Sequence, residues 1–147
     1  MQILVDADAC PVKGIIIKIA KLYKLSVTML IDTSHELEDG YSTVITVDKD
    51  RDSVDIALIN LVKTGDIVVT QDYGVAAMAL GKKAKAVNQN GLIYTDSNID
   101  KLLFERHLGQ KVRRAGGRTT NAKKRTKGDD ANFERGFKSL VDQVVSG

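Results

Sequence analysis

Aspartate residues follow three of the apolar runs in this 147-residue sequence. Asp6 and Asp8 follow residues 3–5, Asp48 follows the run at 41–47, and Asp72 comes two residues after the run at 67–70. Clustered carboxylates repel one another unless a cation lies between them, and oxygen ligands without His or Cys suit Mg²⁺ or Mn²⁺. Because Mg²⁺ usually completes its coordination shell with water and substrate phosphates, the pattern predicts a metal site for phosphodiester or phosphoryl chemistry.

A parallel sheet would bring these carboxylates together. Short apolar runs alternate with segments of helical spacing, which predicts an α/β fold with a mostly parallel sheet covered by helices on each side. Ligand sites of such sheets lie beyond the carboxyl ends of the strands. The expected strands cover residues 3–5, 25–31, 41–47, 67–70 and 84–87, and the expected helices cover 12–23, 73–80, 98–108 and 130–146, with one more between a cap at Asp52 and a stop at Gly65.

Two further features of the aspartates favour a shared site. Asp6 and Asp8 are two residues apart, so in an extended chain they project to the same side with α-carbons about 6 to 7 Å apart. Asp55 lies near the start of the helix that leads into the strand before Asp72. Each aspartate has a second interpretation as a helix cap or a turn residue. Capping explains them only one at a time, whereas a metal site explains them together.

Basic residues are concentrated in one segment. Residues 106–127 contain nine Lys and Arg and no acidic residue, which leaves the rest of the chain with a net charge of −6. We expect a flexible arm over about residues 109–129, followed by a C-terminal helix over 130–146. The arm has almost no aromatic residue, so it would bind nucleic-acid phosphates with little sequence specificity. The candidate nucleic-acid-binding residues are Arg106, Arg113, Arg114, Arg118, Lys123, Lys124, Arg125 and Lys127.

Other features exclude several classes of protein. A single cysteine, Cys10, rules out an intramolecular disulfide, and two histidines are too few for a Cys/His zinc cluster. The first residues have neither the basic start nor the long apolar stretch of a signal peptide, and no window is long and apolar enough for a membrane span. We therefore expect a cytoplasmic protein with no membrane partner. Cys10 lies at an expected helix start, but no histidine is near it in sequence to activate it as a nucleophile.

Four motifs together resemble the YaiI/YqxD family of uncharacterised bacterial proteins. They are VDADACPVK at residues 5–13, VTQDYGVA at 69–76, RH at 106–107 and RRAGGRT at 113–119. The resemblance covers nearly the whole chain. It implies a single domain over residues 1–147 that is more distantly similar to the PIN-like superfamily, whose three-layer α/β/α domains often act as metal-dependent ribonucleases.

The PIN-like pattern has an Asp after the first strand, an acidic residue on a mid-chain helix, and a Thr or Ser with an Asp after the fourth strand. Asp6, Asp55, Thr70 and Asp72 match these positions, and Asp8 is an additional acid. Asp52 is an alternative for the helical position. A further acidic position common in such nucleases has no clear equivalent after Asp72.

Three functions remain open from the sequence. The leading hypothesis is a ribonuclease in which Asp6, Asp8, Asp55 and Asp72 bind one or two Mg²⁺ or Mn²⁺ ions and Thr70 orients a carboxylate or water. The second is a haloacid-dehalogenase-like phosphatase, in which the first Asp of a DxD motif is the nucleophile. It fits less well, because the later acidic pair of that family normally shares one loop, whereas Asp66 and Asp72 lie at opposite ends of an expected strand. The third is a non-catalytic module that binds nucleic acid through the basic arm.

Overall fold

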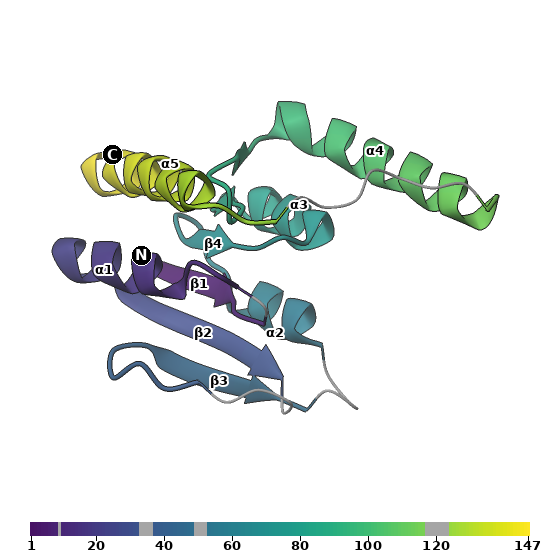
Figure 1. The fold of residues 1–147 in the computed structure, drawn as a ribbon. Helices are drawn as coiled ribbons and strands as arrows, with labels where there is room; N and C mark the ends of the chain where they lie inside the picture. The colour runs from purple at the N-terminus through teal and green to yellow at the C-terminus, as the bar shows by residue number, and fades with distance from the viewer. Residues whose placement is uncertain (9, 33–36, 49–52, 117–123) are drawn as a thin grey trace.

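Short runs of β-branched and aliphatic residues form a mostly parallel sheet in the computed structural model, which describes residues 1–8, 10–32, 37–48, 53–116 and 124–147 (Figure 1). Within those residues the sheet has six strands in the order β3-β2-β1-β4-β5-β6. Every neighbouring pair is parallel except β5 and β6. The strands are β1 (Gln2–Asp6), β2 (Ser26–Asp32), β3 (Thr43–Val47), β4 (Ile67–Val69), β5 (Lys85–Val87) and β6 (Ile93–Tyr94).

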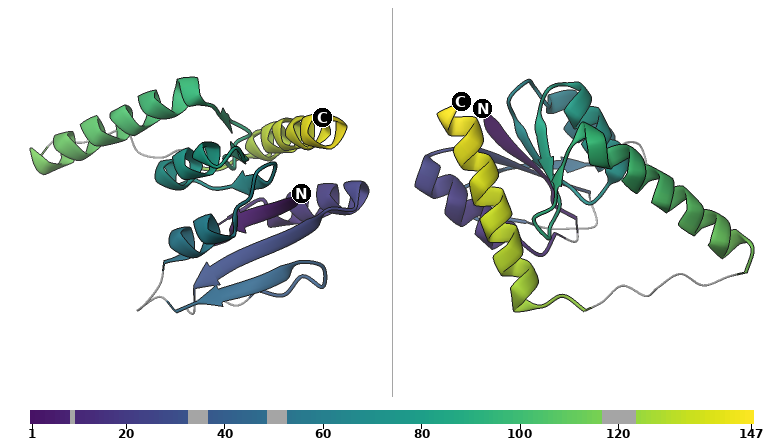
Figure 2. Two further views of the ribbon diagram at one scale, coloured as in Figure 1. Left: turned by 180° about the vertical axis from the view of Figure 1, so that it is seen from behind. Right: turned by 90° about the horizontal axis from the view of Figure 1, so that it is seen from above.

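Helices cover both faces of the sheet, so the predicted three-layer α/β/α architecture is confirmed (Figures 1 and 2). One face carries α1 (Lys13–Tyr23) and α5 (Lys127–Ser146). The other carries α2 (Val54–Leu61), α3 (Tyr73–Gly81) and the start of α4 (Asp96–Arg114). The antiparallel strand β6 was not predicted, because two residues are too short to give a sequence signal.

The alternation of side chains along each strand fills two separate cores. Ile3 and Val5 of β1 pack in the core under α1 and α5, whereas Leu4 packs in the core under α2 and α3. The strand β1 lies between β2 and β4, with Leu4 paired to Val68 in register. The residues that follow β1 and β4 therefore emerge side by side at the same edge of the sheet.

Both ends of α2 differ from the sequence prediction. Ser53, not Asp52, caps α2: its Oγ accepts the Ile56 N–H at 3.4 Å, while Asp52 lies outside the described residues. The helix ends at Leu61 with Val62 as its cap, and Gly65, with a φ of +88°, lies in the turn before β4. A left-handed backbone there favours glycine.

The basic segment is more helical than expected, which corrects the predicted arm of 109–129. The helix α4 continues to Arg114, and α5 begins at Lys127 rather than Asp130. Lys and Arg residues in the last turns of α4 favour its extension, because they complement the negative end of the helix dipole. A capping box between Thr126 and Asp129 starts α5 early. The C-terminal half of α4 extends beyond the sheet (Figure 2).

The C-terminal helix docks as predicted. Its residues Phe133, Phe137, Leu140 and Val141 are buried, and the two phenylalanine rings stack with centroids 5.2 Å apart. The start of the helix is held by Arg125, whose guanidinium donates to Asp130 Oδ1 at 2.8 Å. The same group donates at 2.7 Å to the Asn90 side chain and to the Gln89 carbonyl, in the turn between β5 and β6.

We expect Arg125→Ala to lower the free energy of unfolding by about 1 to 3 kcal/mol, since charge-assisted hydrogen bonds contribute about 1.5 to 3 kcal/mol each and this side chain is partly solvated. Lys124→Ala is the matched control, because Lys124 is exposed. Urea denaturation of both variants measures the difference. An equal effect of the two substitutions would show that the three hydrogen bonds do not hold α5.

Candidate functional site

Asp6 and Thr70 meet at the carboxyl edge of the sheet. Asp6 is the last residue of β1, and Thr70 follows β4, the parallel neighbour of β1. Thr70 is buried, and its hydroxyl donates to Asp6 Oδ2 at 3.2 Å. The same hydroxyl oxygen accepts the Asp72 backbone N–H at 3.0 Å. Thr70 thus orients the Asp6 carboxylate and the start of the loop that carries Asp72.

An acidic cavity of about 390 Å³ opens at this edge. It contains all four aspartates predicted to form the metal site, Asp6, Asp8, Asp55 and Asp72. The full lining is Asp6, Asp8, Asp32, Ser53, Val54, Asp55 and Asp72. Four separate segments of the sequence contribute these carboxylates: the ends of β1 and β2, the start of α2 and the loop after β4.

Sequence reasoning missed Asp32, which also lines the acidic cavity. It is the last residue of β2, and its backbone N–H donates to Asp8 Oδ1 at 3.4 Å. The signal was present in the sequence, because Asp32 directly follows the apolar run that forms β2, as Asp6 ends the apolar run of β1.

The crowding of carboxylates changes the acidity of Asp6. Burial is the largest cause and raises the pKa of this carboxyl to about 6, and repulsion from Asp8, Asp72 and Asp55 adds to the rise. The hydrogen bond from Thr70 opposes it. A cation in the cavity would stabilise the ionised form, since an opposite charge within a few ångströms favours it.

The oxygen donors of the acidic cavity fit Mg²⁺ or Mn²⁺ only in part. Over the described ranges, no three His, Cys, Asp or Glu side chains stand close enough together to hold a metal ion on their own. Asp72 caps α3, with Oδ1 accepting the N–H groups of Gly74 and Val75 at 2.8 and 3.2 Å. A carboxylate has about four lone-pair sites, so these bonds leave it able to bind a cation. Mg²⁺ commonly uses one or two carboxylates with water and substrate phosphates, and this arrangement matches that mode.

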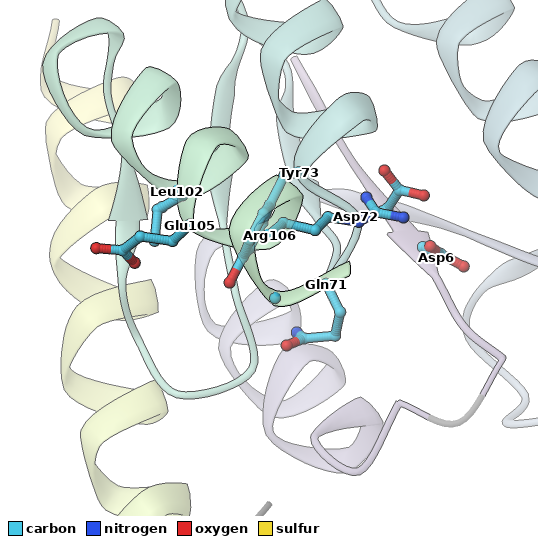
Figure 3. A pocket seen from close by; sticks show the side chains of 8 residues that line it. Asp6, Gln71, Asp72, Tyr73, Leu102, Glu105 and Arg106 are labelled. Carbon is cyan, nitrogen blue, oxygen red and sulfur yellow. The ribbon is translucent and has the colours of Figure 1, made fainter. Parts of the chain in front are cut away.

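A second cavity, of about 620 Å³, adjoins the first and shares Asp6 and Asp72 with it (Figure 3). We refer to it as the α4 cavity, because the middle of that helix forms one wall. Figure 3 shows the Arg106 side chain extending from α4 toward Asp72. The lining residues are Asp6, Gln71, Asp72, Tyr73, Leu102, Glu105, Arg106 and Gly109.

The predicted basic residues lie in different places. Arg106 lines the α4 cavity beside two of the acids, and Arg114 is exposed near the end of α4. Lys124 and Lys127 are exposed next to the start of α5, where Arg125 is bonded within the protein. Arg118, Lys123 and the side chain of Arg113 lie outside the described residues.

Two other sequence hypotheses find little support in the geometry. Burial raises the pKa of the Cys10 thiol, which disfavours the reactive thiolate. Asp66 is buried before β4, where it accepts hydrogen bonds from the backbone N–H groups of Gln2 and Lys63 at 3.1 and 2.9 Å. It therefore stabilises the opposite end of the strand from Asp72 and does not form an acidic pair with it, as the phosphatase hypothesis needs.

Comparison with known proteins identifies a family and several similar chains. The sequence profile of the uncharacterised YaiI/YqxD family matches residues 4–143. The chain is 76% identical over 147 residues to the UPF0178 protein of Ruminiclostridium cellulolyticum. The aligned region covers all of this chain and 96% of that protein. It is 57% identical to the UPF0178 protein of Alkaliphilus oremlandii, over 99% of this chain and 94% of that one. No solved structure is significantly similar. Among the described residues, no helix is long and apolar enough to cross a membrane.

Proposed function

The chain belongs to the uncharacterised YaiI/YqxD family, and we propose that it is a ribonuclease that depends on Mg²⁺ or Mn²⁺. The observation that carries the proposal is the position of Asp6. Its carboxyl, with a pKa of about 6, lies between a cavity lined by five aspartates and a cavity lined by Arg106. Carboxylates that can hold a cation, next to an arginine that can bind a phosphate, suit metal-dependent hydrolysis of a phosphodiester.

Each residue of the site has a distinct part in this proposal. Of the carboxylates of Asp6, Asp8, Asp55 and Asp72, one or two would contact the cation directly and the others would hold it through water, while the Thr70 hydroxyl keeps Asp6 in one orientation. A bound cation supplies Lewis-acid chemistry: it neutralises the phosphate and makes water a better nucleophile. Arg106 binds a phosphate oxygen and stabilises the charge that develops there.

A polymeric substrate fits the surroundings better than a small phosphomonoester. Arg106 and Arg114 lie on one helix that runs from the α4 cavity to beyond the sheet (Figure 2). A strand of RNA that enters the cavity meets further positive charge along this helix. Binding of this kind depends on phosphates and weakens steeply with salt.

A non-catalytic nucleic-acid-binding module is the second candidate. It is favoured by the spacing of the carboxylates, since no three of the described acidic side chains form a metal-binding group by themselves. In that case the basic residues account for all of the affinity, and the aspartates could be replaced without effect on RNA binding.

The test combines calorimetric titration of Mn²⁺ and Mg²⁺ with cleavage of single-stranded RNA. We expect metal-dependent cleavage by the wild type and a loss of more than about tenfold in Asp8→Asn, because even residues that only orient metal ligands change activity 10- to 100-fold. Asp100→Asn is the matched control, since Asp100 is exposed on α4 and lines neither cavity. The ion should bind more tightly when oligonucleotide phosphate is present. RNA that binds but stays intact with both ions would support the binding module instead.

A further inference from the structure

The α4 cavity is larger than a metal-bound phosphate requires. Its volume of about 620 Å³ falls within the range of pockets that hold small organic ligands. Because it shares Asp6 and Asp72 with the acidic cavity, a group held in it would adjoin the proposed reaction centre. The chemistry of its lining therefore indicates what part of the substrate lies next to the phosphate.

An aromatic ring forms part of the lining and is held in place. Tyr73 is the first residue of α3, and its ring meets Tyr94 edge-on, with centroids 6.0 Å apart and planes at 69°. Tyr94 is buried, and its hydroxyl donates to the Thr70 carbonyl at 3.2 Å. Thr70 in turn donates to Asp6, so the aromatic wall and the acidic site share one hydrogen-bonded frame. A ring that is already fixed loses little conformational entropy when a ligand packs on it.

The rest of the lining combines one apolar side chain with three polar ones. Leu102 adds apolar surface from α4, and Gly109 has no side chain to fill the space. Gln71 and Glu105 offer an amide and a carboxylate, which can bond to the edge of a base or to a ribose hydroxyl. Arg106 is a cation at the side that faces Asp72 (Figure 3).

We propose that the α4 cavity is a nucleoside-binding subsite that takes one unstacked base of a single-stranded RNA, packed against Tyr73 and Leu102, with its phosphate at Arg106. The inference rests on the proposed ribonuclease function and specifies its substrate. A base inside a duplex is paired and is stacked on both faces, so it cannot enter a cavity of this kind. The subsite thus selects single strands and is tolerant of sequence, because every base has a face that can stack.

The first test measures the binding of adenosine, adenosine 5′-monophosphate and ribose 5-phosphate by calorimetry in Mg²⁺. We expect the monophosphate to bind at least tenfold more tightly than ribose 5-phosphate, which lacks the base. Tyr73→Leu should weaken the binding of adenosine 5′-monophosphate about five- to a hundredfold, the range expected for the loss of one base–aromatic contact. Leucine keeps an apolar side chain next to Tyr94, and unfolding curves of the variant test whether it is folded. Equal binding of the monophosphate and ribose 5-phosphate would overturn the proposal.

Phe104→Ala is the matched control, because Phe104 lies on the same helix but is 61% exposed and does not line the cavity. This substitution should leave nucleotide binding unchanged. If Phe104→Ala weakens nucleotide binding as much as Tyr73→Leu does, the base does not bind in the α4 cavity against Tyr73, and the proposed subsite is contradicted.

Two further measurements separate this inference from the proposed function. Adenosine carries no phosphate, so its binding should persist in a metal chelator, where cleavage should be lost. Binding of adenosine without any RNA cleavage would support the subsite and overturn the ribonuclease. Conversely, cleavage of single-stranded and duplex RNA at equal rates, with no effect of Tyr73→Leu, would support the ribonuclease and overturn the subsite.

Discussion

Asp6→Asn is expected to abolish metal-dependent cleavage and, at the same time, to make the metal-free protein more stable at pH 7. The loss of activity should exceed about a hundredfold, because substitutions of residues that merely orient metal ligands already cost 10- to 100-fold. The gain in stability follows from the surroundings of Asp6, where burial and three neighbouring carboxylates disfavour its charge. Asparagine removes that charge while its amide oxygen can still accept the hydrogen bond from Thr70.

The sign of the pH dependence follows from the raised pKa. Asp6 has a pKa of about 6 in the folded protein and about 3.8 as an ordinary Asp, so between these values the folded state holds more protons than the unfolded state. The stability of the wild type therefore falls as the pH rises through this window. A shift of this size corresponds to at most about 3 kcal/mol, and partial solvent exposure reduces the expected gain in Asp6→Asn to about 1 to 2 kcal/mol at pH 7.

Urea denaturation of the wild type and Asp6→Asn in a metal chelator at pH 3.5 and pH 7 measures this effect. The two proteins should differ little at pH 3.5, where Asp6 is protonated in the folded state and mostly protonated in the unfolded state, and Asp6→Asn should be the more stable protein at pH 7. Asp100→Asn should change neither stability nor cleavage. If Asp6→Asn is less stable than the wild type at pH 7, the ionised Asp6 carboxylate stabilises the folded protein. That result would contradict the prediction.

Gly136→Ala is expected to destabilise the protein by about 1 to 3 kcal/mol, although alanine is normally the better helix former. A Cβ atom at Gly136 would lie 2.6 Å from the carbonyl oxygen of Gly91, which belongs to the turn between β5 and β6. The turn is held in place by hydrogen bonds from the Gly91 N–H to the Asn88 carbonyl at 3.1 Å and from the Asn88 N–H to the Leu92 carbonyl at 2.9 Å, so it cannot shift freely to make room. The extra methyl group would push α5 off the sheet, and overpacking of this kind costs about 1 to 3 kcal/mol.

Gly14→Ala provides the contrast for this prediction. Gly14 lies in the first turn of α1, and a Cβ there would meet nothing within 4 Å. The same substitution should therefore raise stability by up to about 1 kcal/mol. Thermal and urea unfolding of both variants measure the two effects. Stabilisation by both substitutions would show that α5 can move away from the turn without loss of packing. Neither glycine lines the α4 or the acidic cavity, so RNA cleavage by the folded variants should be unchanged.

The sequence was sufficient to predict the core of the fold because its signals are local. The apolar run at residues 3–5 and the helical stripe that includes Ile16, Ile19 and Ala20 are buried where they were expected. Aspartates at strand ends predicted the acidic cavity, since parallel strands necessarily bring their carboxyl ends to one edge. The same rule, applied to Asp32, would have added the acid that was missed.

The tertiary structure decided the features that depend on contacts between distant segments. The sequence predicts that residues 109–114 belong to an arm, because Gly and basic residues dominate them, yet they continue α4. That extension places Gly109 in the lining of the α4 cavity, on the same helix as Arg106. No property of residues 98–114 alone indicates that they lie beside Tyr73, which is on α3.

Arg125 is a second residue whose role could not be predicted from the sequence. In the sequence it is one of several basic residues, all of which are equally suited to bind phosphates. In the folded chain its guanidinium reaches the turn at Gln89 and Asn90, 35 and more residues away, and fastens α5 there. The types and spacing of residues determined the strands, the covering helices and the acids at one edge. Only the tertiary structure decided which charged side chains bond to a distant partner, because the packing of the whole chain sets the distances between such side chains and their partners.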